Sequence, residues 1–482
     1  MGVKKELVSG AIYVGIARYL GMALSILITM VLSRKLTPGD YGVVALASVM
    51  LAFFNILGEI GIHAAVIQNK TLTAKDMNSL HTFTLYMGIV LGTLFFLISP
   101  LIAQYYDNAE VLVICRWLSI SILLSCARAV PSGILYRNQM FKLTTQLSII
   151  MQILTGSASI VMAYMGYGAK ALVIPQVILG AVTLLVFKYY AQVHFVLHMD
   201  IQPLKRIFGF SAYQFLTNIS AYITRNLDSM LVGKFIGLKP LGYYNKSFHL
   251  MRMPMDNVSG VLMPVMLPVF SKHQDDKVYI LDKYSQILRL FFFIGVPLAT
   301  TLFFCADELV LFLYGDQWGP SVPCFKILAL SVPFQMMGCT SGAIFQSIGR
   351  TNSMFWNSLI GSVITLSGVA IGIIYFRTIE ALAWSYSLSM IVTTFICFYI
   401  LYRALGSTMG RFLQILIQPL LLGVILCAVL ILVSLIPFQV YYVKLFVKLA
   451  VGVLFSAGYV QYWGFYDVNS LVKKLYYKIR RR

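Results

Sequence analysis

The chain has 482 residues, of which 59% are hydrophobic and only 11% are charged. A mean hydropathy of +0.82 with so little charge excludes a soluble globular protein and predicts a polytopic membrane protein. The net charge of +20 does not indicate nucleic-acid binding here, because Lys and Arg collect on the cytoplasmic loops of membrane proteins.

Apolar runs recur along the whole chain and predict an all-α protein with about fourteen transmembrane helices. Each run is near the roughly 20 residues that cross the hydrocarbon core. The expected spans are 9–33, 41–62, 80–103, 110–133, 143–165, 168–190, 209–235, 243–268, 287–305, 321–345, 354–375, 381–402, 412–435 and 442–464. An even number of spans places both termini on one side of the membrane.

The distribution of Lys and Arg predicts which side that is. Basic residues are more numerous in the segments that share a side with the N-terminus than in the opposite loops, so both termini are expected in the cytoplasm. Lys246 is counted with the outer loops. The tail KKLYYKIRRR is expected either to bind anionic membrane lipid or to act only as an orientation signal.

A shift of 200 residues brings out a weak internal repeat. It aligns Tyr13 with Tyr213, Arg34 with Lys234, Leu36 with Ile236 and Gly42 with Gly242. The spacing of the apolar runs agrees, with six spans, a long inner loop and six more spans. We therefore predict a six-helix bundle over 1–200, a second over 201–405, and two additional helices with a basic tail over 406–482. Six spans per repeat make the repeats parallel, so the bundles are expected to face each other about an axis along the membrane normal.

Polar residues form narrow stripes on four of the expected helices, at the spacing that places them on one helical face. In chain order the stripes are Arg18, Ser25 and Thr29; Ser48, Asn55 and Glu59; Gln214, Asn218, Arg225 and Asp228; and Asn245, His249, Arg252, Asp256 and Ser259. The simplest arrangement turns all four toward an aqueous cavity between the bundles. A net positive cavity would attract an anion such as a pyrophosphate or an acidic sugar.

Two alternatives remain for these charges. Arg225 with Asp228, and Arg252 with Asp256, have the spacing of ion pairs that only hold helices together. Charges near helix ends can instead reach the head groups. That second interpretation is preferred for Arg116, Lys326 and Lys448 at outer ends and for Arg128, Arg289 and Glu59 at inner ends.

Other motifs predict little chemistry. The segment HFVLH has metal-ligand spacing but no third ligand, and the seven cysteines lie in apolar runs without a CxxC pair, so no metal site is expected. No GxxxxGK[ST] motif is present, so ATP is not the expected energy source. The loops are too short to hold a catalytic domain, and an enzyme such as a polymerase or ligase is a weak alternative.

Seven segments resemble, in the same order, segments of bacterial polysaccharide exporters. They are LSRKLTPGDYGVVALASVM, GEIGIHAAVIQ, ILYRNQMFK, GYGAKAL, RNLDSMLVGKFIGLKPLGYYNKS, LYGDQW and AIFQSIGRTN. These are Wzx-type flippases of the multidrug/oligosaccharidyl-lipid/polysaccharide superfamily. The branch that exports colanic-acid-like and teichuronic-acid-like polymers is the most similar. The resemblance implies two six-helix bundles in a V-shaped, MATE-like arrangement plus two C-terminal helices, in the bacterial inner membrane. It matches Arg18, Glu59, Arg225 and Asp228 to positions where the family has such residues.

The resemblance implies alternating-access export of undecaprenyl-diphosphate-linked glycan, with a polysaccharide polymerase and other export machinery as possible partners. Together with the stripes, it suggests substrate contact by Arg18, Arg225, Arg252, Asn218 and Gln214. Asp228, Asp256 and Glu59 are candidates for proton or Na⁺ coupling, and no cofactor is expected. A lipid II flippase and a multidrug or cation antiporter of the same superfamily remain alternatives.

Overall fold

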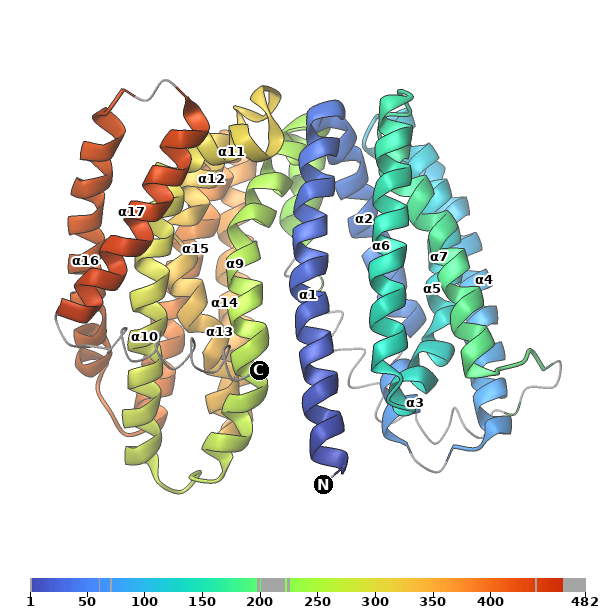
Figure 1. The fold of residues 1–482 in the computed structure, drawn as a ribbon, viewed down its shortest axis with the longest axis horizontal. Coiled ribbons are helices and arrows are strands. Elements are labelled where there is room, and N and C mark those ends of the chain that lie inside the picture. The colour runs from blue at the N-terminus through green and yellow to red at the C-terminus, as the bar shows by residue number, and fades with distance from the viewer. Residues whose placement is uncertain are drawn as a thin grey trace. The chain divides into compact units, whose positions relative to one another are not determined.

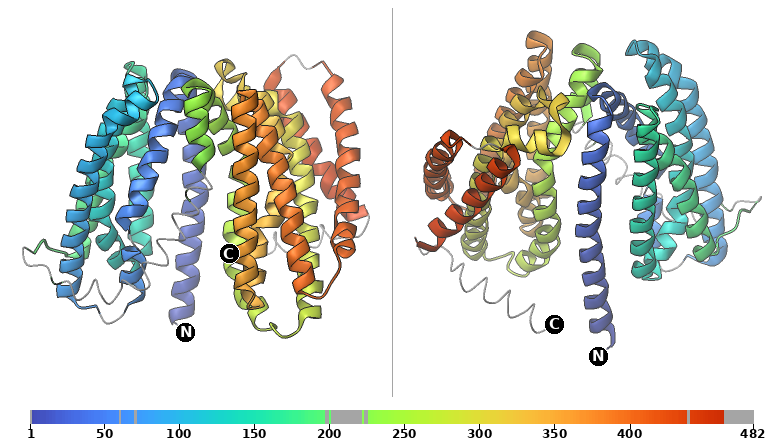
Figure 2. Two further views of the ribbon diagram at one scale, coloured as in Figure 1. Left: turned by 180° about the vertical axis from the view of Figure 1, so that it is seen from behind. Right: turned by 45° about the horizontal axis from the view of Figure 1, so that its top comes forward.

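The computed structural model describes residues 2–59, 61–69, 72–196, 200, 222, 226–437 and 440–462, except for the side chains of 2–17, 59 and 256–265. The described residues divide into two units, unit 1 up to Gly242 and unit 2 from Tyr243. Within each unit the helices run roughly alongside one another (Figure 1 and Figure 2). The boundary predicted at residue 200 borders the undescribed residues 201–221 and stays a prediction.

Unit 1 contains seven labelled helices and the start of an eighth. They are α1 (Gly2–Lys35), α2 (Pro38–Glu59), α3 (Ile62–Gln68), α4 (Ala74–Tyr105), α5 (Ala109–Arg137), α6 (Phe141–Tyr164), α7 (Lys170–Ala191) and the first turns of α9 (Leu238–Ser271). Residues 226–235 are also helical. Most of α9 belongs to unit 2.

Unit 2 continues with α10 (Lys277–Phe304), α11 (Ala306–Tyr314), the 3₁₀ turn η1 (Asp316–Trp318), α12 (Ser321–Ala329), α13 (Val332–Ser347), α14 (Thr351–Ile371), the π-helical turn η2 (Gly372–Phe376), α15 (Ile379–Ala404), α16 (Met409–Leu435) and α17 (Tyr441–Tyr462). The chain bends by 52° between α12 and α13. Pro333 lies in the first turn of α13, where its missing N–H breaks no helical hydrogen bond.

Local sequence explains several helix starts. Thr73 and Asp76 form a capping box at α4, with the Asp76 N–H donating to Thr73 Oγ1 and the Thr73 N–H donating to Asp76 Oδ2. Thr37 and Asp40 exchange the same two hydrogen bonds at α2, at 3.2 and 2.7 Å. The TPGD segment thus begins a helix by satisfying N–H groups that have no partner within the helix.

Small residues let the helices of unit 1 approach closely. A Cβ atom added at Gly88 of α4 would lie 2.9 Å from Cys126 Cβ of α5, and one at Gly92 would lie 2.9 Å from the Ser119 carbonyl oxygen. On α6, a Cβ at Gly156 would lie 2.2 Å from Ile28 Cδ1 of α1. Lipid-embedded helices associate largely through such close packing, because lipid is as apolar as the side chains.

Unit 2 is organised around α10, which packs against α12, α13, α16 and α17. Its Tyr284 is fully buried and shares a 2.8 Å hydrogen bond with Thr340 of α13. Ser285, the next residue, shares a 3.1 Å hydrogen bond with the Tyr402 hydroxyl of α15. The Phe412 ring of α16 stacks on Phe398 at 4.6 Å. Buried hydroxyls are therefore satisfied within an otherwise apolar helix bundle.

The membrane prediction is confirmed at the level of a multi-pass, all-helical protein. Ten helices in the described part are long and apolar enough to cross a membrane, and α12 with α13 would make an eleventh span. The other three predicted spans, 9–33, 209–235 and 243–268, contain residues or side chains outside the description. The total of fourteen therefore stays a prediction.

Candidate functional site

The predicted substrate residue Arg18 lies at the middle of α1. It is the seventeenth of the 34 residues of this helix, which at 1.5 Å per residue is roughly 50 Å long. The Arg18 and Ser25 side chains are exposed, whereas Gly21 receives a 2.8 Å hydrogen bond on its carbonyl oxygen from the Gln152 amide of α6. Arg18 therefore presents a positive charge midway along α1, on a face of the helix that is not covered by unit 1.

The polar stripe of α9 is likewise on an uncovered face. Asn245 and His249 are exposed and Arg252 is half-buried, whereas Tyr244 and Met251 are buried against unit 2. The Arg252 guanidinium lies 5.8 Å from the centre of the Phe248 ring, within the range of a cation–π contact. Arg252 is the fifteenth of 34 residues in α9 and so, like Arg18, lies far from both helix ends.

Asp228 is in a different environment. Its helical segment, 226–235, packs within unit 1, where Asp228 is only 8% exposed. The Tyr222 hydroxyl donates to the Val49 carbonyl of α2 at 2.9 Å, and the Tyr106 hydroxyl donates to the Met230 carbonyl at 3.3 Å. The Met230 contact binds the segment to the end of α4, and the Tyr222 contact binds a residue shortly before the segment to α2.

The second predicted stripe has a helix-packing role in part. The Ser125 hydroxyl of α5 donates to Asn55 Oδ1 of α2 at 2.7 Å, so Asn55 joins two helices of unit 1. Ser48 of the same stripe is exposed. Asn55 therefore holds two helices together. This is the alternative role, in place of lining a cavity, that the sequence left open for the polar residues of the spans.

The remaining predicted site residues lie outside the described part of the structure. Gln214, Asn218 and Arg225 fall among the undescribed residues, and Glu59 and Asp256 lie in α2 and α9 without described side chains. The structure therefore places Arg18 and Asp228 in unit 1 and Arg252 in unit 2. It does not test the cavity or either proposed ion pair.

Two buried cations of unit 2 differ from the sequence interpretation. Lys448 was expected to reach the head groups, but it is 3% exposed, and its Nζ lies 2.7 Å from Glu308 Oε1 and 2.7 Å from the Phe304 carbonyl oxygen. Lys444 Nζ lies 3.5 Å from the same carboxylate oxygen. The expectation for Lys448 is wrong, because α17 docks on α10 and α11 and brings this face of the helix against Glu308.

Lys246 is also buried rather than placed in an outer loop. It lies within α9 and is 7% exposed, with its Nζ 4.9 Å from the centre of the Tyr314 ring and 5.7 Å from that of Trp318. The helix begins earlier than hydropathy suggests, because Gly237 adopts φ 121° and Pro240 lies in the first turn. Both residues are helix-start signals visible in the sequence.

The weak metal motif receives no support from a described ligand cluster. His194 is exposed, and its backbone N–H donates to Asn78 Oδ1 at 2.9 Å, while His198 lies outside the description. In the described ranges, no three His, Cys, Asp or Glu side chains gather as a metal site would require.

Comparison with known proteins gives one family. Residues 31–323 match the family described as polysaccharide biosynthesis protein. The teichuronic acid biosynthesis protein TuaB of Bacillus subtilis is 22% identical over 398 residues, 82% of each chain. The succinoglycan biosynthesis transport protein ExoT of Rhizobium meliloti is 24% identical over 366 residues, 73% of this chain and 72% of the other. Among solved structures, the lipid II flippase MurJ in an inward closed conformation superposes with a TM-score of 0.75 at 15% identity, over 94% of this chain and 98% of that one.

Proposed function

Since the chain belongs to the family of polysaccharide biosynthesis proteins, we propose that it carries undecaprenyl-diphosphate-linked oligosaccharide repeat units outward across the bacterial inner membrane. The family is one of membrane transporters rather than enzymes, and this chain is a multi-pass member. Relatives named for teichuronic acid biosynthesis and for succinoglycan transport support a lipid-linked polysaccharide precursor as the substrate class.

The observation that carries the proposal is the polar stripe of α9, in which Asn245 and His249 are exposed and Arg252 is half-buried near the middle of a long helix. A charged side chain at mid-bilayer costs about 2.5–3.5 kcal/mol on insertion scales, and such residues usually meet water or a polar partner. Asn245, His249 and Arg252 together form a surface that suits hydroxyl-rich sugars and phosphate, because amides bind hydroxyls and Arg binds phosphate in a bidentate manner. Exposed Arg18 on α1 supplies the same chemistry in unit 1.

The mechanism that we propose is alternating access. Arg18, Arg252 and the undescribed Arg225 bind the diphosphate or acidic sugars, with Gln214 and Asn218 beside them. The cavity opens first to the cytoplasm, where both termini lie, and then to the opposite side. Asp228, Asp256 and Glu59 are the proposed groups for proton or Na⁺ coupling, since a carboxylate within the membrane can change its charge during a cycle.

The related transport functions are less well supported. The likeness to the lipid II flippase concerns the fold, at 15% sequence identity, whereas the family match and the curated relatives concern polysaccharides. A multidrug or cation antiporter would be expected to present acids to its substrate, whereas the side chains described in the stripes of α1 and α9 include exposed Arg18, half-buried Arg252 and no acid.

A reconstitution experiment tests the proposal directly. Liposomes are prepared with a polyprenyl-diphosphate-linked oligosaccharide in both leaflets, so that external glycosidase digests only about half of it when no protein is present. The reconstituted protein should make nearly all of the oligosaccharide accessible while a trapped dye stays inside. Digestion that stops at half with folded protein would overturn the proposal. Parallel liposomes with lipid II, and uptake of a cationic dye, test the two alternatives.

A further inference from the structure

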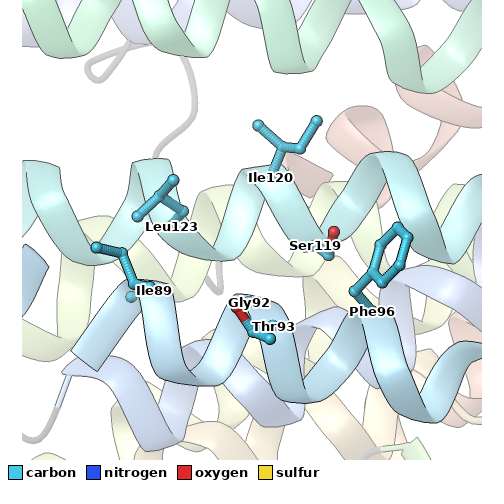
Figure 3. A pocket seen from close by; sticks show the side chains of 8 residues that line it. Ile89, Gly92, Thr93, Phe96, Ser119, Ile120 and Leu123 are labelled. Atoms are coloured by element: carbon cyan, nitrogen blue, oxygen red, sulfur yellow. The ribbon is translucent and has the colours of Figure 1, made fainter. Parts of the chain in front are cut away.

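A groove on the surface of unit 1 runs between α4 and α5 (Figure 3). Its volume is about 250 Å³, and it is lined by Gly88, Ile89, Gly92, Thr93, Phe96, Ser119, Ile120 and Leu123. Gly88 and Gly92 bring α4 close to α5 at the floor of the groove, and the larger exposed side chains of both helices form its walls. Most of its lining is apolar, and its volume is below the roughly 300–1,000 Å³ of typical small-molecule pockets, which suits one narrow hydrocarbon chain.

The groove opens outward from the helix pair. Its lining residues Ile89, Phe96 and Ile120 are 46%, 43% and 42% exposed, so their side chains border open space rather than the core of unit 1. Both helices qualify as membrane spans. A concave apolar surface on the outside of two membrane helices is bathed by lipid chains.

A positive charge lies at one end of this groove. The Arg116 guanidinium of α5 lies 5.0 Å from the centre of the Phe96 ring, so one aromatic ring both lines the groove and holds the cation. Arg116 is exposed, and no carboxylate in the described part of the chain forms a salt bridge with it. The charge is available to an anionic group from the surrounding lipid.

The depth of Arg116 matches that of a lipid phosphate. Arg116 is the eighth residue of the 29-residue helix α5, roughly 10 Å from its start. A helix of that length measures about 43 Å, which exceeds a hydrocarbon core of about 30 Å by some 7 Å at each end when centred. The Arg116 backbone therefore lies only a few ångströms inside the core edge, and its long side chain reaches the phosphate level.

We propose that the α4–α5 groove is a binding site for an anionic phospholipid, with one acyl chain along Ile89 and Ile120 and the phosphate on Arg116. Charge complementarity selects an anionic head group over a zwitterionic one, and the single guanidinium suits a single phosphate. The proposal does not depend on which substrate the protein transports.

Native mass spectrometry of the full-length protein tests this site, with phosphatidylglycerol and phosphatidylcholine of identical acyl chains as probes. Arg116→Gln should weaken phosphatidylglycerol binding roughly tenfold and phosphatidylcholine binding clearly less, because the choline ammonium already offsets part of the attraction between Arg116 and the phosphate. Thr93→Trp, which fills the groove from an exposed position, should weaken both. The matched controls are Arg128→Gln, an exposed arginine farther along α5, and Leu97→Trp, an exposed residue of α4 outside the groove.

Three results would overturn the proposal. One is an equal loss of phosphatidylglycerol binding in Arg128→Gln and Arg116→Gln. Another is a photoactivatable phosphatidylglycerol that crosslinks elsewhere but not to the peptides holding Ile89 and Ile120. The third is a polyprenyl phosphate that displaces phosphatidylglycerol from the groove at equal concentration, which would assign the site to the carrier chain. Crosslinking at those two peptides that Thr93→Trp abolishes would support the phospholipid site.

Discussion

Replacing Lys448 with Met should destabilise unit 2 strongly, because it leaves the Glu308 carboxylate buried without its main partner. The Lys448 ammonium contacts Glu308 Oε1 at 2.7 Å, and both side chains are less than a tenth exposed. Glu308 Oε2 already lacks a hydrogen-bond partner among the described residues. Removal of one member of a buried ion pair typically costs about 3–5 kcal/mol. The lower end applies here, since Lys444 lies 3.5 Å from the same oxygen and can take over part of the interaction.

The assay is thermal unfolding of the detergent-solubilised protein. Unit 2 spans 243–482, and for domains of 150–250 residues each kcal/mol shifts the melting temperature by roughly 2–4 °C, so about 3 kcal/mol corresponds to a fall of roughly 6–12 °C. Lys326→Met is the matched control, because Lys326 pairs with Asp307 at 2.6 Å while both side chains stay partly exposed, and such pairs contribute about 0–1 kcal/mol.

The double variant Lys448→Met with Glu308→Gln should recover most of the lost stability, since it removes the uncompensated charge as well. Equal and small shifts for Lys448→Met and Lys326→Met would refute the reasoning. So would a double variant as unstable as the single one.

Three further changes have expected outcomes. Gly42→Ala should lower the melting temperature or prevent folding, because its Cβ would lie 1.7 Å from the Leu238 carbonyl oxygen; Gly39→Ala, whose Cβ meets nothing closer than 3.6 Å, should not. The Cys305 thiol is fully buried at the junction of α10 and α11, so reagents in solution do not reach it in the folded protein. Maleimide at pH 8 should therefore spare Cys305 in the folded protein and label an exposed Gln317→Cys, as read by mass spectrometry. Arg252→Gln should slow oligosaccharide transport in liposomes roughly tenfold or more, because a charge-assisted contact with phosphate is worth about 1.5–3 kcal/mol; an unchanged rate would remove Arg252 from the proposed site.

The helical membrane architecture was predictable because hydropathy acts locally along the chain. Eleven of the fourteen expected spans correspond to described helices that are long and apolar enough to cross a membrane, the bent pair α12 and α13 included. The shared exposure of Asn245 and His249 was also predictable, since residues spaced four apart lie on one helical face. Hydropathy missed the early start of α9, although Gly237 and Pro240 signal it.

The partners of buried charges were not predictable in this way. Lys448 and Glu308 are 140 residues apart, and nothing in a single sequence pairs them. The spacing of Lys444, Lys448 and Gly452 was a usable hint, since two cations and a glycine on one face of α17 indicate a close helix contact. A Cβ at Gly452 would lie 2.4 Å from Thr301 Oγ1 of α10, so this face of α17 is where the helix docks. The tertiary contact decides that Lys448 is buried rather than extended toward the head groups.

The weak repeat gains a physical meaning from one contact within unit 1. A Cβ at Gly42 would lie 1.7 Å from the Leu238 carbonyl oxygen, and a Cβ at Gly242 would lie 1.9 Å from the Pro38 carbonyl oxygen. The shift of 200 residues relates Pro38 to Leu238 as well as Gly42 to Gly242, so the contact is reciprocal. Backbone meets backbone at these four residues, which only glycine permits at positions 42 and 242. Most aligned positions of the repeat carry different residues. At this pair both copies need a glycine for the same steric reason, so the two glycines are evidence for the repeat.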